Sequence, residues 1–276
     1  MIFSAPAKIN LSLKVLGKRA DGFHEIESLF VPISLADELS IERADEFAFT
    51  CDQPDIPTDA GNLVVRAAQL FFERSKNAPR VQIALTKHIP HGAGLGGGSS
   101  DAATTLLALN EIFATGFTTE VLTRMAAELG SDIPFFVHRS AAICRGRGEI
   151  VTPQLFNTNL PLLLLKPPFG VPTPWAYQRW RDSRELPGVP YSAQQFSWDE
   201  LVNDLERPVF EKYIFLAALK QWLLSQPEVA GALMSGSGST VFAILRDVAH
   251  GAVLGEKARA EFGESLWTCA TATIAN

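Results

Sequence analysis

Cysteine is scarce in this sequence, with three residues, Cys51, Cys144 and Cys269, in a chain of 276. They lie far apart, and none belongs to a Cys-x-x-Cys pair. This pattern argues against a disulfide framework and against a zinc site, and it favours a reducing compartment. We expect all three to be buried small hydrophobic side chains.

Concentrated positive charge is also lacking. The chain has 24 Lys and Arg against 30 Asp and Glu, a formal net charge of −6 and a pI of about 5.4. No block rich in Lys and Arg occurs, so nucleic acid and acidic membrane surfaces are poor candidate partners. An anionic substrate would have to be bound by local groups, because the whole molecule provides no positive field.

Long apolar runs are absent as well. The longest, at about Leu160 to Leu165, is too short to span a bilayer. The first residues do not predict a signal peptide, because Pro6 and Lys8 stand where an apolar segment would be needed. We therefore expect a cytoplasmic protein. A composition of 47% apolar and 20% charged residues is typical of a globular chain with one large domain or two ordinary ones.

Periodicity predicts the secondary structure of the first half. Apolar and polar residues alternate over 9–16, which predicts a half-buried strand with Lys8 and Asn10 on one face. A turn-rich loop is expected at 17–25. Further strands are expected at 38–43, 46–51, 81–86, 140–145 and 148–151, and helices at 62–74, 99–114 and 119–129.

Prolines crowd the chain from about residue 153 onward, and we place a domain boundary near 150–160, giving domains 1–152 and 153–276. Ser197 and Glu200 resemble a capping box, which predicts a helix at 198–205. The mixture of strand runs and helix runs favours an α+β fold. The other elements expected here are strands at 160–166, 229–234, 240–246 and 266–274, and helices at 174–182, 208–225 and 248–262.

A glycine-rich segment over residues 90–100, Pro-His-Gly-Ala-Gly-Leu-Gly-Gly-Gly-Ser-Ser, leads into a predicted helix. Its five glycines within seven residues are costly in backbone entropy. The cost is explained if backbone amides and the helix start bind an anion. A flexible turn with a serine cap is the alternative, but so many glycines before a helix favour phosphate binding. Ser99 and Ser100 could cap the helix, bind phosphate or reach Mg²⁺.

Two common phosphate loops fit this segment poorly. A dinucleotide fingerprint needs its turn directly after the strand and an acidic residue about 20 positions on. Here residues 88–91 intervene, and Glu111 falls inside the helix, which weakens the reading as an NAD-dependent dehydrogenase. A Walker loop needs a lysine after the glycines, and none follows. A third kind of phosphate loop is left, in which a cation from elsewhere in the chain assists.

Three segments together resemble the GHMP kinase superfamily of galacto-, homoserine, mevalonate and phosphomevalonate kinases. They are Pro-Ala-Lys-Ile-Asn-Leu at 6–11, the glycine-rich 92–100, and Met-Ser-Gly-Ser-Gly-Ser-Thr at 234–240. The finer pattern is similar to the family of CDP-methylerythritol kinases within it. That pattern lies in residues 5–13, 17–25, 96–100, 130–135 and 171–174.

The resemblance implies a two-domain fold, with an N-terminal domain like domain 2 of ribosomal protein S5 and a ferredoxin-like C-terminal domain. It implies transfer of the γ-phosphate of ATP to the 2-hydroxyl of CDP-methylerythritol in the non-mevalonate isoprenoid pathway, with Mg²⁺. We expect a monomer or weak homodimer. Another GHMP kinase, acting on mevalonate or homoserine, and a non-catalytic nucleotide-binding regulator are the alternatives.

The resemblance identifies Lys8 and Asp132 as the catalytic pair. A carboxylate can orient the attacking hydroxyl and accept its proton, and a nearby cation can stabilise the charge on the transferred phosphoryl group. From spacing alone, Lys8 could be a solvated strand lysine and Asp132 a capping residue after Gly130. The sequence contains no cluster of carboxylates from which the metal ligands could be identified. Ser99 or Ser100 and Asp132 are candidates.

Substrate contacts are implied for Asn10, Phe23, His24, Thr173 and Tyr177. Aromatic rings in this set could stack on cytosine, although Phe23 stands where related enzymes often have Tyr and lacks its hydroxyl contact. Asn10 could instead be a surface asparagine, Phe23 a packing residue and Thr173 a turn residue.

The nucleotide side is implied to include Asn62, Leu63 and Lys87, the last of which could be an ordinary strand-end lysine. Residues 235–239 could support the cleft or form a simple hairpin turn. The full predicted nucleotide-binding set is Asn62, Leu63, Lys87, Pro90, His91, Gly92, Ala93, Gly94, Leu95, Gly96, Gly97, Gly98, Ser99 and Ser100.

Overall fold

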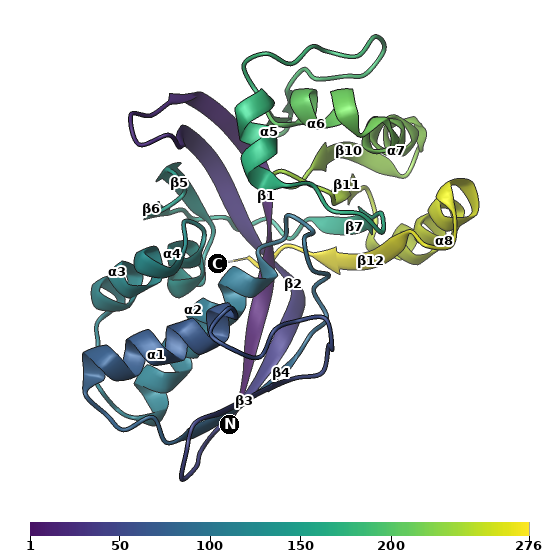
Figure 1. Cartoon of the computed structure of the whole chain (residues 1–276). Helices are drawn as coiled ribbons and strands as arrows, with labels where there is room; N and C mark the ends of the chain where they lie inside the picture. The colour runs from purple at the N-terminus through teal and green to yellow at the C-terminus, as the bar shows by residue number, and fades with distance from the viewer. Residues whose placement is uncertain (276) are drawn as a thin grey trace.

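Two long strands, joined by a hairpin, form the spine of the molecule. The computed structural model describes residues 1–275, and Figure 1 shows the strands running between the two halves of the chain. The sheet built around them has the order β3-β4-β2-β1-β9-β8, and β5 pairs with both β2 and β6. Its strands are β1 (Ile2–Lys18), β2 (His24–Arg43), β3 (Ala48–Cys51), β4 (Val81–Thr86), β5 (Ala142–Gly146), β6 (Ile150–Pro153), β8 (Gln194–Gln195) and β9 (Glu200–Asn203).

Helices of the first half pack on this sheet around one apolar core. The aromatic cluster of Phe71, Phe72, Phe113 and Phe117 lies in this core, with ring centroids 5.2–6.3 Å apart. Asn62 caps the first helix as predicted, because its side chain accepts a hydrogen bond from the Val64 amide. The helices are α1 (Leu63–Ser75), α2 (Gly97–Ile112), α3 (Thr119–Leu129) and the short α4 (Ile133–His138).

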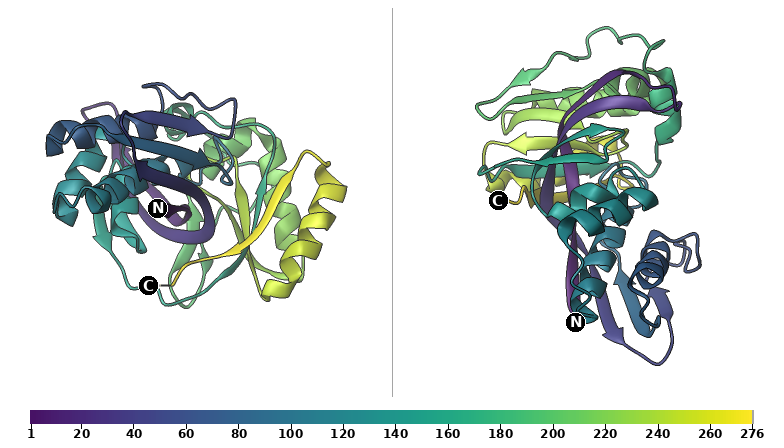
Figure 2. Two further views of the ribbon diagram at one scale, coloured as in Figure 1. Left: turned by 90° about the horizontal axis from the view of Figure 1, so that it is seen from below. Right: turned by 90° about the vertical axis from the view of Figure 1, so that its left-hand side faces the viewer.

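The second half forms an antiparallel sheet of order β10-β11-β7-β12, with helices on it (Figure 2). The mixed strands and helices of the two halves confirm the α+β prediction. The strands are β7 (Pro161–Lys166), β10 (Val229–Met234), β11 (Val241–Leu245) and β12 (Trp267–Ala272). The helices are α5 (Thr173–Arg179), α6 (Glu206–Lys212), α7 (Ile214–Ser225) and α8 (Gly251–Phe262), with a 3₁₀ turn at Val248–His250.

β1 is buried on both faces in its middle, so the prediction of a half-buried strand was wrong there. Ala7, Ile9 and Leu11 are fully buried in a cluster that includes Leu162 and Leu164 of the second sheet. Lys8 and Asn10 are 3% and 1% exposed on the other face. The two faces are buried because the second sheet covers one and residues of the first half cover the other.

The helix predicted at 198–205 was also wrong, because this segment contains the strand β9. Its buried residues alternate, and it pairs in parallel with β1 through Ser12–Val202 and Leu13–Asn203. Glu200 does not take part in a capping box and forms an ion pair with Lys14 instead. A pairing partner nearly two hundred residues away overrides the local helix signal.

Three smaller differences separate the sequence analysis from the structure. The helix predicted at 208–225 is two helices, α6 and α7, which are separated by Tyr213. Helix α4 was not predicted. All three cysteines are free, but Cys144 alone is buried while Cys51 and Cys269 are half-buried. None of the helices between residues 1 and 275 combines the length and apolarity that crossing a bilayer requires.

The two halves are interlocked by β8 and β9, which follow the second-half strand β7 in sequence yet join the first sheet. We retain the division into 1–152 and 153–276 as a proposal for the main sheets only. At the end of β9, Asn203 donates hydrogen bonds to the carbonyls of Met234 (2.7 Å) and Gly236 (2.8 Å). Its own side-chain oxygen accepts from the Leu205 amide at 2.9 Å.

Replacing Asn203 tests whether its hydrogen bonds hold the two halves together. We expect Asn203→Ala to lower the free energy of unfolding by about 2–4 kcal/mol, because two buried carbonyls and one amide lose their partners. Urea unfolding, followed by tryptophan fluorescence, measures the change. The control is Asn157→Ala at an exposed loop position, with an expected change within about 0.5 kcal/mol. Equal stability of the two variants would contradict the role given to Asn203.

Candidate active site

Two cavities lie next to each other and share Gly94 and Gly96 of the glycine-rich loop. The first has a volume of about 490 Å³ and contains residues of β1, the β1–β2 hairpin, α5 and the segment before α4. The second has a volume of about 420 Å³ and lies beside the starts of α1 and α2. A group bound on the shared loop would therefore face both cavities.

The loop itself can be built only from glycine at several positions. Gly92, Gly94 and Gly96 have φ values of 63°, 75° and 72°, a region that side chains other than glycine rarely adopt. A Cβ atom on Gly94 would lie 2.3 Å from the Ser235 carbonyl oxygen, and one on Gly96 would lie 2.7 Å from the Phe136 ring. The glycines are thus required by backbone conformation and by close packing.

Helix α2 begins at Gly97, two residues earlier than predicted, with Gly96 as N-cap and no side-chain cap. Ser99 and Ser100 therefore lie within the first turn, and the proposal that they cap the helix was wrong. The first amides of a helix have no partner inside it, so this end of α2 presents donors and the positive end of its dipole. This is the arrangement that binds phosphate.

The Gly/Ser turn at 235–239 satisfies both interpretations left open by the sequence. It connects β10 to β11 as a hairpin turn, and it also packs on the glycine-rich loop. The Ser235 hydroxyl donates to the Gly94 carbonyl at 3.0 Å, and the Thr240 amide donates to the Ala93 carbonyl at 3.2 Å. The second half of the chain thus holds the loop in place.

Lys8 reaches the first cavity from β1. Its Nζ donates to Asn10 Oδ1 at 2.6 Å and lies 4.6 Å from the centroid of the Phe30 ring. The Asn10 amide in turn donates to Ser28 Oγ at 2.8 Å. Burial lowers the pKa of Lys8, and the negative charge of Asp132 acts in the opposite direction. The alternative of a solvated strand lysine is therefore excluded by its 3% exposure.

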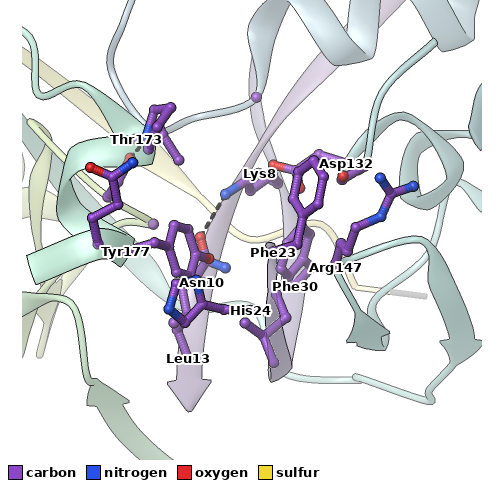
Figure 3. Close-up of a pocket in the computed structure, with 18 of the residues that line it drawn as sticks. Lys8, Asn10, Leu13, Phe23, His24, Phe30, Asp132, Arg147, Thr173 and Tyr177 are labelled. Carbon is purple, nitrogen blue, oxygen red and sulfur yellow. Dashed lines mark hydrogen bonds between the residues drawn. The ribbon is translucent and has the colours of Figure 1, made fainter. Parts of the chain in front are cut away.

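Asp132 lies in the short connection between α3 and α4 and lines the same cavity as Lys8 (Figure 3). It occupies the N-cap position of α4, but its side chain makes no capping hydrogen bond. The carboxylate is therefore not used for capping, which was the alternative considered from sequence. Its negative charge opposes the effect of burial on the pKa of Lys8.

Aromatic residues form the other end of this cavity. The His24 ring stacks on Tyr177 with centroids 5.4 Å apart, and Trp180, which the sequence analysis did not single out, packs edge-on against His24 at 6.2 Å. Burial lowers the pKa of His24 and raises that of Tyr177, so both rings are neutral near pH 7. Phe23 is 50% exposed, and the Thr173 hydroxyl is 2.7 Å from Ser237 Oγ.

Sequence reasoning missed Arg147, which lines the first cavity from the turn between β5 and β6. The available signal was the Arg-Gly-Arg-Gly sequence at 145–148, between two predicted strands. Gly146 and Gly148 have φ values of 72° and 118°, so the turn depends on glycine on both sides of this arginine.

In the second cavity, Asn62, Leu63 and the loop residues 90–99 lie together as predicted. The side chain of Asn62 is already used by the fold, since it accepts from Val64 N and donates to the Pro57 carbonyl, each at 2.8 Å. Pro57 lines the same cavity and was not predicted.

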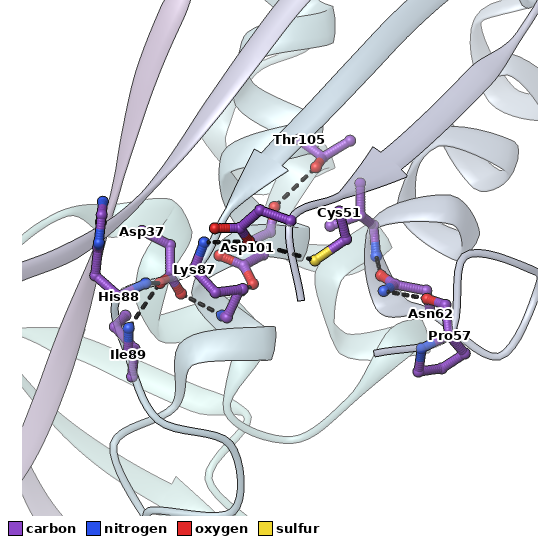
Figure 4. A network of polar contacts seen from close by, with 11 residues as sticks. Asp37, Cys51, Pro57, Asn62, Lys87, His88, Ile89, Asp101 and Thr105 are labelled. Carbon is purple, nitrogen blue, oxygen red and sulfur yellow. Dashed lines mark hydrogen bonds and ion pairs between the residues drawn. The ribbon is translucent and has the colours of Figure 1, made fainter. Parts of the chain in front are cut away.

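Lys87 lies at the centre of a buried ionic network rather than at a solvated strand end (Figure 4). Its Nζ pairs closely with Asp37 and contacts Asp101 at 2.8 Å. Asp37 also accepts the amides of His88 (2.6 Å) and Ile89 (2.8 Å), which fixes the chain entering the loop. Burial raises the pKa of Asp101 to about 7, against the opposing charge of Lys87. Neither aspartate was predicted.

A metal bound by protein side chains alone is not indicated. No group of three or more His, Cys, Asp and Glu suited to a metal ion occurs within residues 1–275. Ser100 Oγ and Asp101 Oδ1 are both buried at the start of α2 without a hydrogen-bond partner. Such unpaired oxygens fit one or two ligands to a cation that is otherwise bound by phosphate and water.

Comparison with known proteins identifies the fold and family. The family model for the GHMP kinases N terminal domain matches residues 62–140, and the model for the GHMP kinases C terminal matches 192–264. Solved structures of a mevalonate kinase (12% identical, TM-score 0.71) and of a homoserine kinase from Cytophaga hutchinsonii (18%, TM-score 0.68) share the fold. They cover all of this chain, and the chain covers 100% and 94% of them.

Closer relatives carry one name, 4-diphosphocytidyl-2-C-methyl-D-erythritol kinase. The protein of that name from Methylacidiphilum infernorum is 46% identical, over 95% of this chain and 93% of its own length. One from a Synechococcus strain is 41% identical, over 94% and 89%. A crystal structure of 4-(cytidine 5'-diphospho)-2C-methyl-D-erythritol kinase is 36% identical over the full length of both chains, with a TM-score of 0.83. The chain therefore belongs to the GHMP kinase superfamily and, within it, to the family of 4-diphosphocytidyl-2-C-methyl-D-erythritol kinases.

Proposed function

We propose that this protein transfers the γ-phosphate of ATP to the 2-hydroxyl of CDP-methylerythritol, a step of the non-mevalonate isoprenoid pathway. The observation that carries the proposal is the common cavity of Lys8 and Asp132, which adjoins the glycine-rich loop. Relatives of that name, 46% and 41% identical, support the choice of acceptor. A cytoplasmic location is part of the proposal, because ATP is the phosphoryl donor.

The reacting groups have defined roles in this proposal. Asp132 orients the hydroxyl and accepts its proton as the oxygen attacks the γ-phosphorus. The bond from the γ-phosphorus to the bridging oxygen of ATP breaks, and ADP leaves. Lys8 stabilises the negative charge that the transferred group spreads over its oxygens. Asn10 and the Phe30 ring hold the Lys8 ammonium in position.

ATP would occupy the second cavity, with its base beside Asn62 and Leu63 and its phosphates on residues 92–99. The amides of the loop and of the first turn of α2 supply most of the binding to phosphate. Lys87 contributes less free charge than an isolated lysine, because it is paired with Asp37 and Asp101. Its main role is to fix the loop entrance.

Mg²⁺ would be held by Ser100, by oxygens of ATP and by water. The unpaired hydroxyl of Ser100 beside the phosphate loop supports this assignment. The ion would neutralise charge that develops on the phosphates during transfer.

The cytidine of the acceptor would lie against the aromatic end of the first cavity. Phe23 and Tyr177 offer ring faces, and His24 offers polar ring atoms from the same wall. Phe23 supplies a stacking surface without a hydroxyl group. Thr173 and its partner Ser237 add a polar edge.

The nearest rival is another GHMP kinase that phosphorylates mevalonate or homoserine. Those kinases share the fold at 12–19% identity, a level that says nothing about the acceptor. An aromatic-walled cavity of about 490 Å³ is larger than such small acids need, and it favours a nucleotide acceptor. A non-catalytic regulator is disfavoured because the Asp132 carboxylate makes no capping hydrogen bond to α4 and so has no structural use there.

A substitution at residue 132 tests the mechanism. We expect Asp132→Asn to reduce kcat by about 10²–10⁴, because the general base is lost while the shape of the side chain is kept. Steady-state ADP release measures kcat, and thermal unfolding confirms the fold. Asp182→Asn, at an exposed position after α5, is the control and should leave kcat unchanged. Near-normal turnover in the folded Asp132 variant would remove this residue from the mechanism.

A panel of acceptors tests the substrate. In a coupled assay of ADP release, we expect turnover with CDP-methylerythritol and only background rates with mevalonate and homoserine, since neither small acid can use the aromatic wall. The ATP-only rate serves as the baseline. Equal turnover with mevalonate would assign the chain to another GHMP activity, and ATP binding without turnover on any acceptor would favour the regulator.

A further inference from the structure

We propose that Arg147 binds the diphosphate of the acceptor and selects acceptors that carry one. The inference rests on the proposed function, in which the acceptor joins a cytidine to an alcohol through a diphosphate. With a net charge of −6, the protein offers no general attraction to this anion. A local cation in the first cavity must supply it.

Two cations line this cavity within the described residues, Lys8 and Arg147. Lys8 is 3% exposed and is held by Asn10 at the end next to the glycine-rich loop, where the phosphoryl group is transferred. The Arg147 side chain is 32% exposed. A ligand can therefore contact Arg147 without first disturbing the buried contacts that Lys8 makes with Asn10 and Phe30.

The position of Arg147 fits the middle of the acceptor. Its guanidinium carbon lies 4.7 Å from the centroid of the Phe23 ring, at the aromatic end of the cavity. On the other side, a Cβ atom on the adjacent Gly148 would be 3.1 Å from Asp132 Oδ1, so the turn packs against the catalytic carboxylate. Figure 3 shows Arg147 with Phe23, and Asp132 lines the same cavity. A diphosphate joining cytidine to the reacting alcohol must cross this space.

The guanidinium is only weakly engaged by the protein. Its Nε lies 3.7 Å from Glu149 Oε1, beyond hydrogen-bond distance, and no hydrogen bond from the guanidinium to the described residues is formed. Asp21, which also lines this cavity, pairs with Arg19 at 3.2 Å. The planar fork of Arg147 is thus free to bind phosphate oxygens through two donors, while its contact with the Phe23 ring keeps it at this end of the cavity.

Binding of CDP and cytidine separates this role from simple support of the Phe23 ring. Calorimetry gives both dissociation constants, with a non-hydrolysable ATP analogue saturating the nucleotide site. We expect Arg147→Gln to weaken CDP binding by about 10- to 100-fold, because the charge of a partly exposed side chain is lost together with about one charge-assisted hydrogen bond's worth of binding. Cytidine affinity should change less than about 2-fold, because it carries no phosphate.

Arg145→Gln is the matched control. Arg145 lies two residues away on β5, pairs with Glu27 at 2.8 Å and does not line the cavity. We expect this variant to keep the wild-type preference for CDP over cytidine. If the glutamine variant at 147 fails to fold, Arg147→Lys replaces it and should reduce the preference by about 3- to 10-fold, because lysine lacks the fork.

An unchanged CDP-to-cytidine preference at Arg147→Gln would overturn the inference, as would equal losses for both ligands in a folded variant. Failure of the proposed function would look different. The wild type itself would then bind neither CDP nor cytidine, and this result would overturn both proposals.

Discussion

The site depends on the register of β1, because this one strand serves the cavity and the core at once. Its odd-numbered residues Ala7 and Ile9 fill the contact with the second sheet, and its even-numbered Lys8 and Asn10 line the first cavity. A shift of one residue would exchange the faces, burying an ammonium among leucines. Burial on both faces therefore fixes the position of the Lys8 ammonium more firmly than any contact of the ammonium itself.

The same contact between the two sheets also positions the glycine-rich loop. Gly94 lies against the turn at 235–239 so closely that a Cβ atom would overlap the Ser235 carbonyl. Asn203 lies at the end of β9, the strand that pairs with β1. Its side chain donates hydrogen bonds to the carbonyls of Met234 and Gly236 and so fixes that turn. The glycine-rich loop, β1 and the second half of the chain are thus positioned by one continuous set of contacts, made by backbone groups and by the side chains of Asn203 and Ser235. Loosening any one of them would move the others.

Sequence reasoning located what the local pattern encodes and missed what distant pairing creates. The glycine-rich loop, the cap at Asn62 and the family pattern at Lys8 and Asp132 are local signals. Strand β9 was predicted as a helix because its partner Ser12 is distant in sequence. Asp37, one partner of Lys87, was missed for the same reason, since it lies in the distant strand β2 and carries no motif of its own. Arg147 was visible only as an arginine between glycines.

Three cations line the two cavities in the described part of the chain, and they differ in how far the protein neutralises them. Lys87 is paired with two buried carboxylates, which neutralise its charge within the fold. Lys8 is desolvated with Asp132 nearby, which leaves it able to respond to charge that appears on a reacting phosphoryl group. Arg147 has only a long contact with Glu149 and is partly exposed. Arg147 is therefore the most exposed of the three cations, and an exposed cation without a close ion pair is the one best suited to attract an incoming anion to an acidic protein.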